Sequence, residues 1–114
     1  MNPLDQVPQI DAQATYEQWQ NGEVGLLDVR ERSEWDLGHI EGTDLIPLGQ
    51  VPWRLRELDP EKKWVCVCRS GNRSNYAAAL LRQAGMEAAN MSGGMLDWHA
   101  HRLPITPPGI VESH

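Results

Sequence analysis

Residues 64–74 of this 114-residue chain read WVCVCRSGNRS, which places a cysteine between a buried strand and a helix. Residues 64–67 form a short apolar run, the pattern typical of a strand inside a sheet. The helix predicted after the loop has one apolar face and ends at Gly85. Cys68 is therefore expected at the carboxyl end of a strand, the edge at which open parallel sheets bind their ligands.

The rest of the chain shows the same alternation of apolar runs and amphipathic stretches. Six further elements are predicted: a helix over 12–20 with Asp11 as its N-cap, strands over 24–29 and 45–48, a helix over about 50–58, a weak strand over 88–91 and a short helix over 95–101. Strands that alternate with helices predict an α/β fold, an open parallel sheet with helices on both faces.

The composition is that of one water-soluble domain, with 40% hydrophobic and 23% charged residues. We expect a single domain over 1–114, with a folded core over about 8–102 and a Pro-rich tail over 103–114 that has no regular element. No apolar run approaches the ~18 residues that suggest a membrane span. The first residues resemble no secretory signal, so a cytoplasmic location is expected.

The net charge of −6 argues against nucleic acid or an anionic membrane as the main partner, because both require a basic surface. The only two cysteines, Cys66 and Cys68, are too few and too close for a disulfide scaffold, so they are interpreted as thiols. Cys66 is expected to pack in the core. The alternative is that it resolves or protects Cys68, although residues two apart on a strand lie far apart for a disulfide.

The loop after Cys68 has the features of an anion-binding site. Backbone N–H groups at a helix N-terminus have no partner within the helix, and the helix dipole adds positive charge there. Such surroundings lower the pKa of a thiol, and Arg69 and Arg73 add two full charges. Sulfur transfer and phosphoryl or arsenate transfer both use this arrangement. The loop has four residues between Cys68 and Arg73, one fewer than in cysteine phosphatases, which favours a single bound sulfur atom.

Four segments in order resemble the single-domain rhodanese (thiosulfate sulfurtransferase-like) family. They are Leu26-Leu27-Asp28-Val29-Arg30; Glu34-Trp35 with Gly38-His39-Ile40, Gly42 and Ile46-Pro47-Leu48; the loop Cys68-Arg69-Ser70-Gly71-Asn72-Arg73-Ser74; and Gly93-Gly94 with Trp98. The resemblance covers nearly the whole chain.

The resemblance implies a five-stranded parallel sheet and a sulfurtransferase in which Cys68 forms a persulfide. The donor would be a small sulfur anion such as thiosulfate, and the acceptor cyanide, a thiol or a protein. No cofactor is implied, and the domain is expected to act as a monomer or weak homodimer. The alternatives are a cysteine-based phosphatase or arsenate reductase, and a non-catalytic sulfur relay or binding module. The substrate-binding residues would be Arg69, Ser70, Gly71, Asn72, Arg73 and Ser74.

Three further polar residues are expected to support the structure. Asp28 lies at a strand end, and Arg30 is expected to pair with a nearby carboxylate, since a preformed thiolate needs no general base. His39 is the third of these residues. No metal site is predicted, because His99 and His101 would point to different sides of a helix and no other set has ligand spacing.

Overall fold

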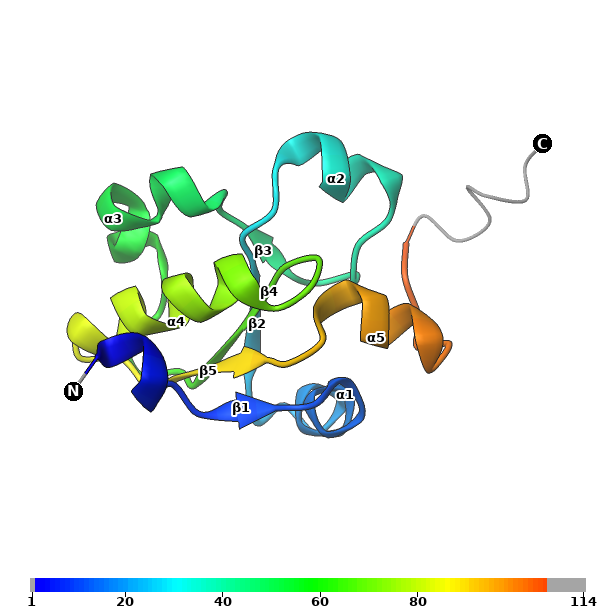
Figure 1. The fold of residues 1–114 in the computed structure, drawn as a ribbon, viewed down its shortest axis with the longest axis horizontal. Helices are drawn as coiled ribbons and strands as arrows, with labels where there is room; N and C mark the ends of the chain where they lie inside the picture. The colour runs from blue at the N-terminus through cyan, green and yellow to red at the C-terminus, as the bar shows by residue number, and fades with distance from the viewer. Residues whose placement is uncertain (1, 107–114) are drawn as a thin grey trace.

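The fold was taken from a computed structural model, which describes residues 2–106 (Figure 1). The predicted Pro-rich tail over 103–114 falls mostly on residues 107–114, outside the described part. The elements in chain order are η1 (Pro3–Gln6), β1 (Gln9–Ile10), α1 (Ala12–Gln20), β2 (Gly25–Asp28), α2 (Arg32–Leu37), β3 (Asp44–Leu45), η2 (Leu48–Gln50), α3 (Val51–Arg54), η3 (Leu55–Glu57), β4 (Trp64–Val67), α4 (Asn72–Gln83), β5 (Ala88–Met91) and α5 (Gly94–Ala100).

The five strands form one parallel sheet in the order β1-β5-β4-β2-β3. β4 lies at its centre, with Cys66 opposite Leu27 of β2 and Asn90 of β5. The strands β2 and β4 are buried along their whole length, as expected where helices cover both faces of a parallel sheet. The predicted α/β class and five-stranded sheet are therefore confirmed.

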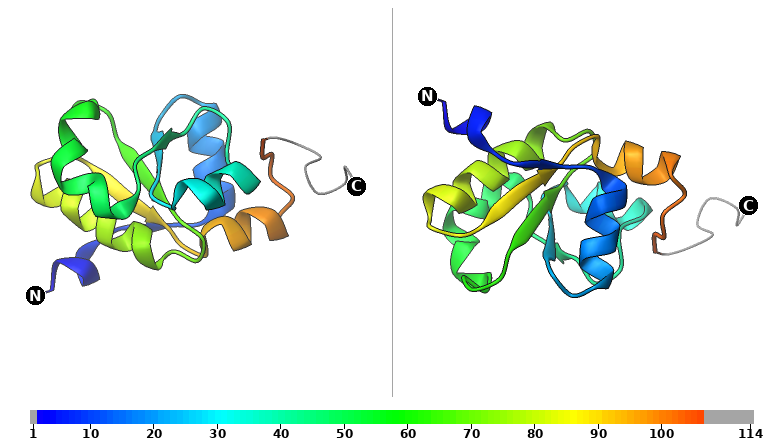
Figure 2. Two further views of the ribbon diagram at one scale, coloured as in Figure 1. Left: turned by 90° about the horizontal axis from the view of Figure 1, so that it is seen from above. Right: turned by 90° about the horizontal axis from the view of Figure 1, so that it is seen from below.

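Alternate residues of the central strands point into two separate cores. On one face, Leu27 and Cys66 pack under α3 and α4. On the other, Leu26 and Val65 pack against α1 and α5. Figure 2 shows α3 and α4 on one side of the sheet and α1 and α5 on the other. Among the described residues, no helix is long and apolar enough to cross a membrane.

The predicted ends of several elements match the structure because local signals set them. α1 spans the predicted residues, and the side chain of Asp11 accepts a hydrogen bond from the Ala14 N–H at its start. β4 and β5 also have the predicted bounds.

Other predicted elements differ from the structure. The helix expected over about 50–58 is divided into η2, α3 and η3. The strand expected over 45–48 ends at Leu45, although the N–H groups of Ile46 and Leu48 still donate to the carbonyls of Asp28 and Val29. β1 was not predicted, since two residues after Pro8 are too few to show a period.

The packed body extends beyond the predicted boundary at residue 102. Leu103 and Ile105 pack against the core under α1 and α5, and the Trp98 Nε1–H donates to the Pro104 carbonyl at 2.8 Å. Thr106 forms a backbone bridge with His39. The segment lacks a helix or strand but is held in place.

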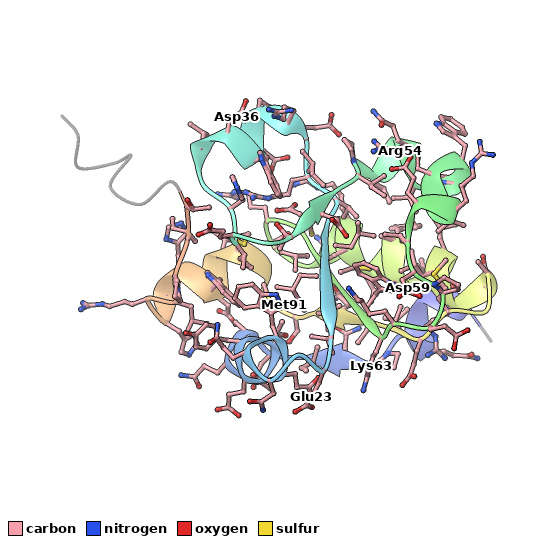
Figure 3. The ribbon with its side chains drawn as sticks, turned by 180° about the vertical axis from the view of Figure 1, so that it is seen from behind. Glu23, Asp36, Arg54, Asp59, Lys63 and Met91 are labelled. Atoms are coloured by element: carbon pink, nitrogen blue, oxygen red, sulfur yellow. The ribbon has the colours of Figure 1, made fainter. Side chains whose placement is uncertain are left out.

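The two ends of the strands lie on opposite sides of the molecule. Glu23 and Lys63, which precede β2 and β4, lie at one side in Figure 3, and Asp36 of α2 lies at the other. The loop between β4 and α4 belongs to the second side, where it lies between α2 and α5 (Figure 1). The Cys68 loop is therefore at the carboxyl ends of the strands.

Candidate active site around Cys68

The Cys68 sulfur is surrounded by hydrogen-bond donors from its own loop. The N–H groups of Gly71 and Ser74 donate to Sγ at 3.1 and 3.3 Å, and the Ser74 hydroxyl oxygen lies 3.2 Å from it. Cys68 itself is 0% exposed. The sulfur is therefore held by protein N–H groups in place of water, an arrangement that suits a negative charge on sulfur.

These contacts decide the ionisation of Cys68. Burial opposes the thiolate, but the hydrogen bonds from Ser74, Gly71 and Ser70 outweigh it and lower the pKa of Cys68 below its usual value. Cys66 shows the opposite behaviour: it is 0% exposed, and burial first, then the nearby Cys68, raises the pKa of its thiol. Only one of the two cysteines is suited to act as a nucleophile.

The loop needs glycine at position 71. Gly71 has φ +103° and precedes the first turn of α4, where it turns its N–H towards Cys68. It is also tightly enclosed, since an added Cβ would lie 3.3 Å from the Gly93 N–H nitrogen. A positive φ and a close backbone approach occur together here.

Arg73 is not a free cation in this structure. Its guanidinium donates to both carboxylate oxygens of Glu34 on α2, at 2.7 and 2.8 Å. The hydrogen bond from Arg73 is the main cause that lowers the pKa of Glu34 to about 2. The sequence predicts that Arg73 attracts the donor, and that role stays a prediction. The sequence does not predict the pairing of Arg73 with Glu34.

Arg69 differs from Arg73 in its surroundings. It is exposed, and no ion pair to it occurs within residues 2–106. It lines a pocket of about 210 Å³ between α2 and α5, together with Leu37, Leu96 and His99. Ser70 and Asn72 are also exposed. The unpaired positive charge beside the loop is thus carried by Arg69.

Asp28 and Arg30 form a buried pair next to the site. The Arg30 Nη2 donates to Asp28 Oδ2 at 2.8 Å, and the side chains are 8% and 1% exposed. Arg30 also donates to the carbonyl of Gly38 at 2.9 Å, beyond the end of α2. The pair therefore ties the end of β2 to α2, the helix that carries Glu34.

His39 lies outside the group around Cys68. Its ring stacks on Trp35 at 3.6 Å between centroids, and its Nδ1 lies 2.9 Å from the Trp35 carbonyl oxygen. Among the described residues, no group of three or more His, Cys, Asp or Glu side chains is placed to hold a metal ion.

The helix α5 supports the loop from the other side. Its Met95 and Leu96 N–H groups donate to the carbonyls of Cys68 and Arg69, at 2.8 and 3.1 Å. Asn90 of β5 contacts both Ser74 and Gly71. Sequence reasoning missed Asn90, and the available signal was an amide inside an otherwise apolar strand.

Residues 11–101 match the family described as Rhodanese-like domain. The chain belongs to this family. A protein of Allochromatium vinosum named "Sulfurtransferase" is 35% identical over 104 residues, which cover 90% of this chain and 97% of that protein. The rhodanese-like domain is thus a member of a family whose relatives include sulfurtransferases, as the resemblance in the sequence predicts.

Solved structures of rhodanese-like proteins share the fold. The rhodanese-related protein from Thermoplasma volcanium matches with a TM-score of 0.82 and 30% identity, covering 87% of this chain and 97% of that one. The rhodanese-like domain of the Anabaena Alr3790 protein matches with a TM-score of 0.79 and 31% identity, covering 94% and 83%. Similar domains also occur within longer proteins: this chain spans 38% of the HTH-type transcriptional regulator Rv0324 of Mycobacterium tuberculosis, at 37% identity.

Proposed function

We propose that this rhodanese-like domain transfers a sulfane sulfur from a small anionic donor such as thiosulfate to a thiophilic acceptor through a persulfide on Cys68. The observation that carries the proposal is the set of N–H donors from Gly71 and Ser74 on the Cys68 sulfur. They lower the pKa of Cys68 and so favour its thiolate, which is the nucleophile that the reaction requires.

The first step forms an S–S bond. The Cys68 thiolate attacks the outer sulfur of thiosulfate, the S–S bond of the donor breaks, and sulfite leaves with the bonding electron pair. The charge on the protein then lies on the outer sulfur of the persulfide. In the second step cyanide or a thiolate attacks that outer sulfur, and Cys68 leaves as the thiolate.

The surroundings of the loop suit an anionic donor in one respect. Arg69 is the cation beside the loop without an ion pair among the described residues, whereas Arg73 shares its charge with Glu34. We therefore assign the attraction of the donor chiefly to Arg69. Arg73 and Glu34 hold α4 and α2 together at the mouth of the loop.

Intact-mass measurement tests this function directly. Thiosulfate is expected to add the mass of one sulfur atom, and cyanide to remove it as thiocyanate. Cys68→Ser should abolish both changes, whereas the control Cys66→Ser should retain them, because the Cys66 thiol is buried and its pKa is raised. Sulfur transfer that persists in Cys68→Ser would show the assignment to be wrong.

A sulfur relay to a protein acceptor is a second candidate. Leu37 and Leu96 are 71% and 49% exposed, and both line the pocket that contains Arg69. Exposed apolar side chains beside a reactive site are typical of a protein contact. Leu37→Ser should then slow transfer to a protein acceptor and leave transfer to cyanide unchanged. If Leu37→Ser changed the rates with the two acceptors by the same factor, this role would be excluded.

A further inference from the structure

Asn90 is a buried amide that contacts two residues of the Cys68 loop. It lies in β5 and is 3% exposed. Its Oδ1 lies 2.5 Å from the hydroxyl oxygen of Ser74, and its Nδ2 donates to the carbonyl of Gly71 at 3.0 Å. No hydrogen bond among the described residues joins Asn90 to the Cys68 sulfur, so its hydrogen-bonding effect on Cys68 passes through these two residues.

Backbone carbonyls determine which way the amide of Asn90 points. A carbonyl oxygen can only accept, so the Gly71 carbonyl requires the Nδ2 end. Gln9 is oriented in the same way, because its Nε2 donates to the Val7 carbonyl and its Oε1 accepts from Asn90 Nδ2 at 2.9 Å. The Oδ1 of Asn90 must therefore face Ser74, and it can only accept there.

The Ser74 hydroxyl has one proton and two neighbouring acceptors. Asn90 Oδ1 is 2.5 Å from the hydroxyl oxygen, and Cys68 Sγ is 3.2 Å from it. When the Cys68 sulfur is neutral, the shorter contact to Asn90 is the better hydrogen bond. When the sulfur is a thiolate, its charge attracts the proton, but two acceptor oxygens are then left facing each other. The proton cannot satisfy both acceptors at once.

We propose that Asn90 is a positioning residue that competes with Cys68 for the Ser74 hydroxyl proton and so favours the states in which the Cys68 sulfur is neutral. On ionisation, the thiol proton leaves to water and the Ser74 hydroxyl rotates from Asn90 to the thiolate, with no covalent bond of Ser74 broken. On persulfide formation the charge moves to the outer sulfur as the donor's leaving group departs, and the hydroxyl returns to Asn90. This second part rests on the proposed sulfur transfer, whereas the first part does not.

Other titratable groups also act on Cys68. They are Arg73 of α4 with its partner Glu34 of α2, and the thiol of Cys66 in β4. The buried Asp28–Arg30 pair lies at the end of the neighbouring strand β2. Within the described residues, none of these groups forms a hydrogen bond with Asn90. A substitution at Asn90 therefore changes the hydrogen bond that the Ser74 hydroxyl donates and leaves all of these groups in place.

The unaltered protein provides the first test. NMR signals of the Asn90 side-chain amide should shift with pH at the midpoint of Cys68 ionisation, and should shift back when thiosulfate is added at a pH where Cys68 is a thiolate. The amide of Asn21 is the control, since its Nδ2 donates to Glu23 and no hydrogen bond among the described residues links it to Asn90 or to the Cys68 loop. Asn90 signals that stay constant through the ionisation of Cys68 would overturn the proposal. A pH response without a thiosulfate response would leave the competition intact and count against sulfur transfer.

A double-mutant cycle provides the second test. The pH dependence of Cys68 alkylation by iodoacetamide is measured for the wild type, Asn90→Leu, Ser74→Ala and the double variant. Asn90→Leu also removes the hydrogen bond to Gly71, but that loss occurs in both backgrounds and cancels in the comparison. Asn90→Leu should lower the pH midpoint of alkylation when Ser74 is present. This shift should exceed the shift that Asn90→Leu causes in the Ser74→Ala background by about 0.7 pH unit, as expected for one released neutral hydrogen bond. An equal effect of Asn90→Leu in both backgrounds would refute the competition.

Discussion

Gly94→Ala should damage the Cys68 loop through a direct backbone clash. Gly94 begins α5 with φ +59°, and a Cβ added there would lie against the Arg69 carbonyl oxygen and 2.6 Å from the Cys68 carbonyl oxygen. Real Cβ atoms keep at least 3.0 Å from such neighbours, so the loop or α5 must move by about 0.4 Å or more. The same place holds the hydrogen bond from Met95 to the Cys68 carbonyl.

The cost has two parts that a control variant separates. A positive φ costs a residue with a Cβ about 1–2 kcal/mol. Moving packed backbone costs a further ~1–3 kcal/mol, so the free energy of unfolding of Gly94→Ala should fall by about 2–5 kcal/mol. Gly22 has φ +74° but nothing within 4 Å of its added Cβ. Gly22→Ala should therefore lose only the first part.

Two measurements check the clash. Urea unfolding compares the stability of the two variants, and the rate of sulfur uptake from thiosulfate reports the loop geometry under conditions where both variants are folded. Because a small misplacement of reacting groups slows a reaction strongly, uptake by Gly94→Ala should fall by about 10- to 100-fold, and that of Gly22→Ala should not change. Equal losses of stability in the two variants, with unchanged uptake in both, would refute the argument from close approach.

Three further predictions follow from individual contacts. Glu34→Gln should lower the free energy of unfolding at pH 7 by about 1–2 kcal/mol, because it weakens a partly buried bidentate pair with Arg73. Because the pKa of Glu34 is lowered to about 2 from 4.5, this advantage of the wild type is present above pH 4.5 and is lost as the pH falls towards 2. Asp28→Asn should cost about 3–5 kcal/mol, since it leaves the Arg30 charge buried without a counter-charge. Cys66→Ala should cost about 1 kcal/mol for a small cavity, and a thiol reagent at neutral pH should label the folded wild-type protein once, at Cys68.

Two exposed ion pairs provide control variants for these predictions, and the number of thiol labels on the folded protein tests the prediction for Cys66. Glu57→Gln breaks the exposed pair with Arg54 and should lower the stability much less than Glu34→Gln does, so equal effects of the two substitutions would contradict the role assigned to Glu34. Asp36→Asn serves the same purpose for Asp28→Asn, because its pair with Arg32 is exposed. Two labels on the folded wild-type protein would contradict the account of Cys66. The variants are compared by urea unfolding, and the labels are counted by intact mass.

Elements with strong local signals could be predicted from the sequence. The apolar run at Trp64–Val67 and the cap at Asp11 involve neighbours along the chain, so their structural consequences do not depend on the rest of the fold. The position of Cys68 between a strand and a helix follows from the same kind of signal. The loop donors around its sulfur also come from residues within six positions of it.

Contacts between distant segments required the tertiary structure. The Arg73–Glu34 pair joins residues 39 positions apart, and Asn90 reaches Gly71 across 19 positions. Both contacts depend on which strands are neighbours in the sheet, and no local pattern in the sequence predicts the order β1-β5-β4-β2-β3. The sequence by itself therefore predicted Cys68 as the nucleophile and placed a loop with hydrogen-bond donors directly after it. Only the fold decided that the charge of Arg73 is shared with Glu34 and that Asn90 contacts Ser74. These partners are far apart in the sequence and become neighbours only when the strands assemble into the sheet and the helices pack on it.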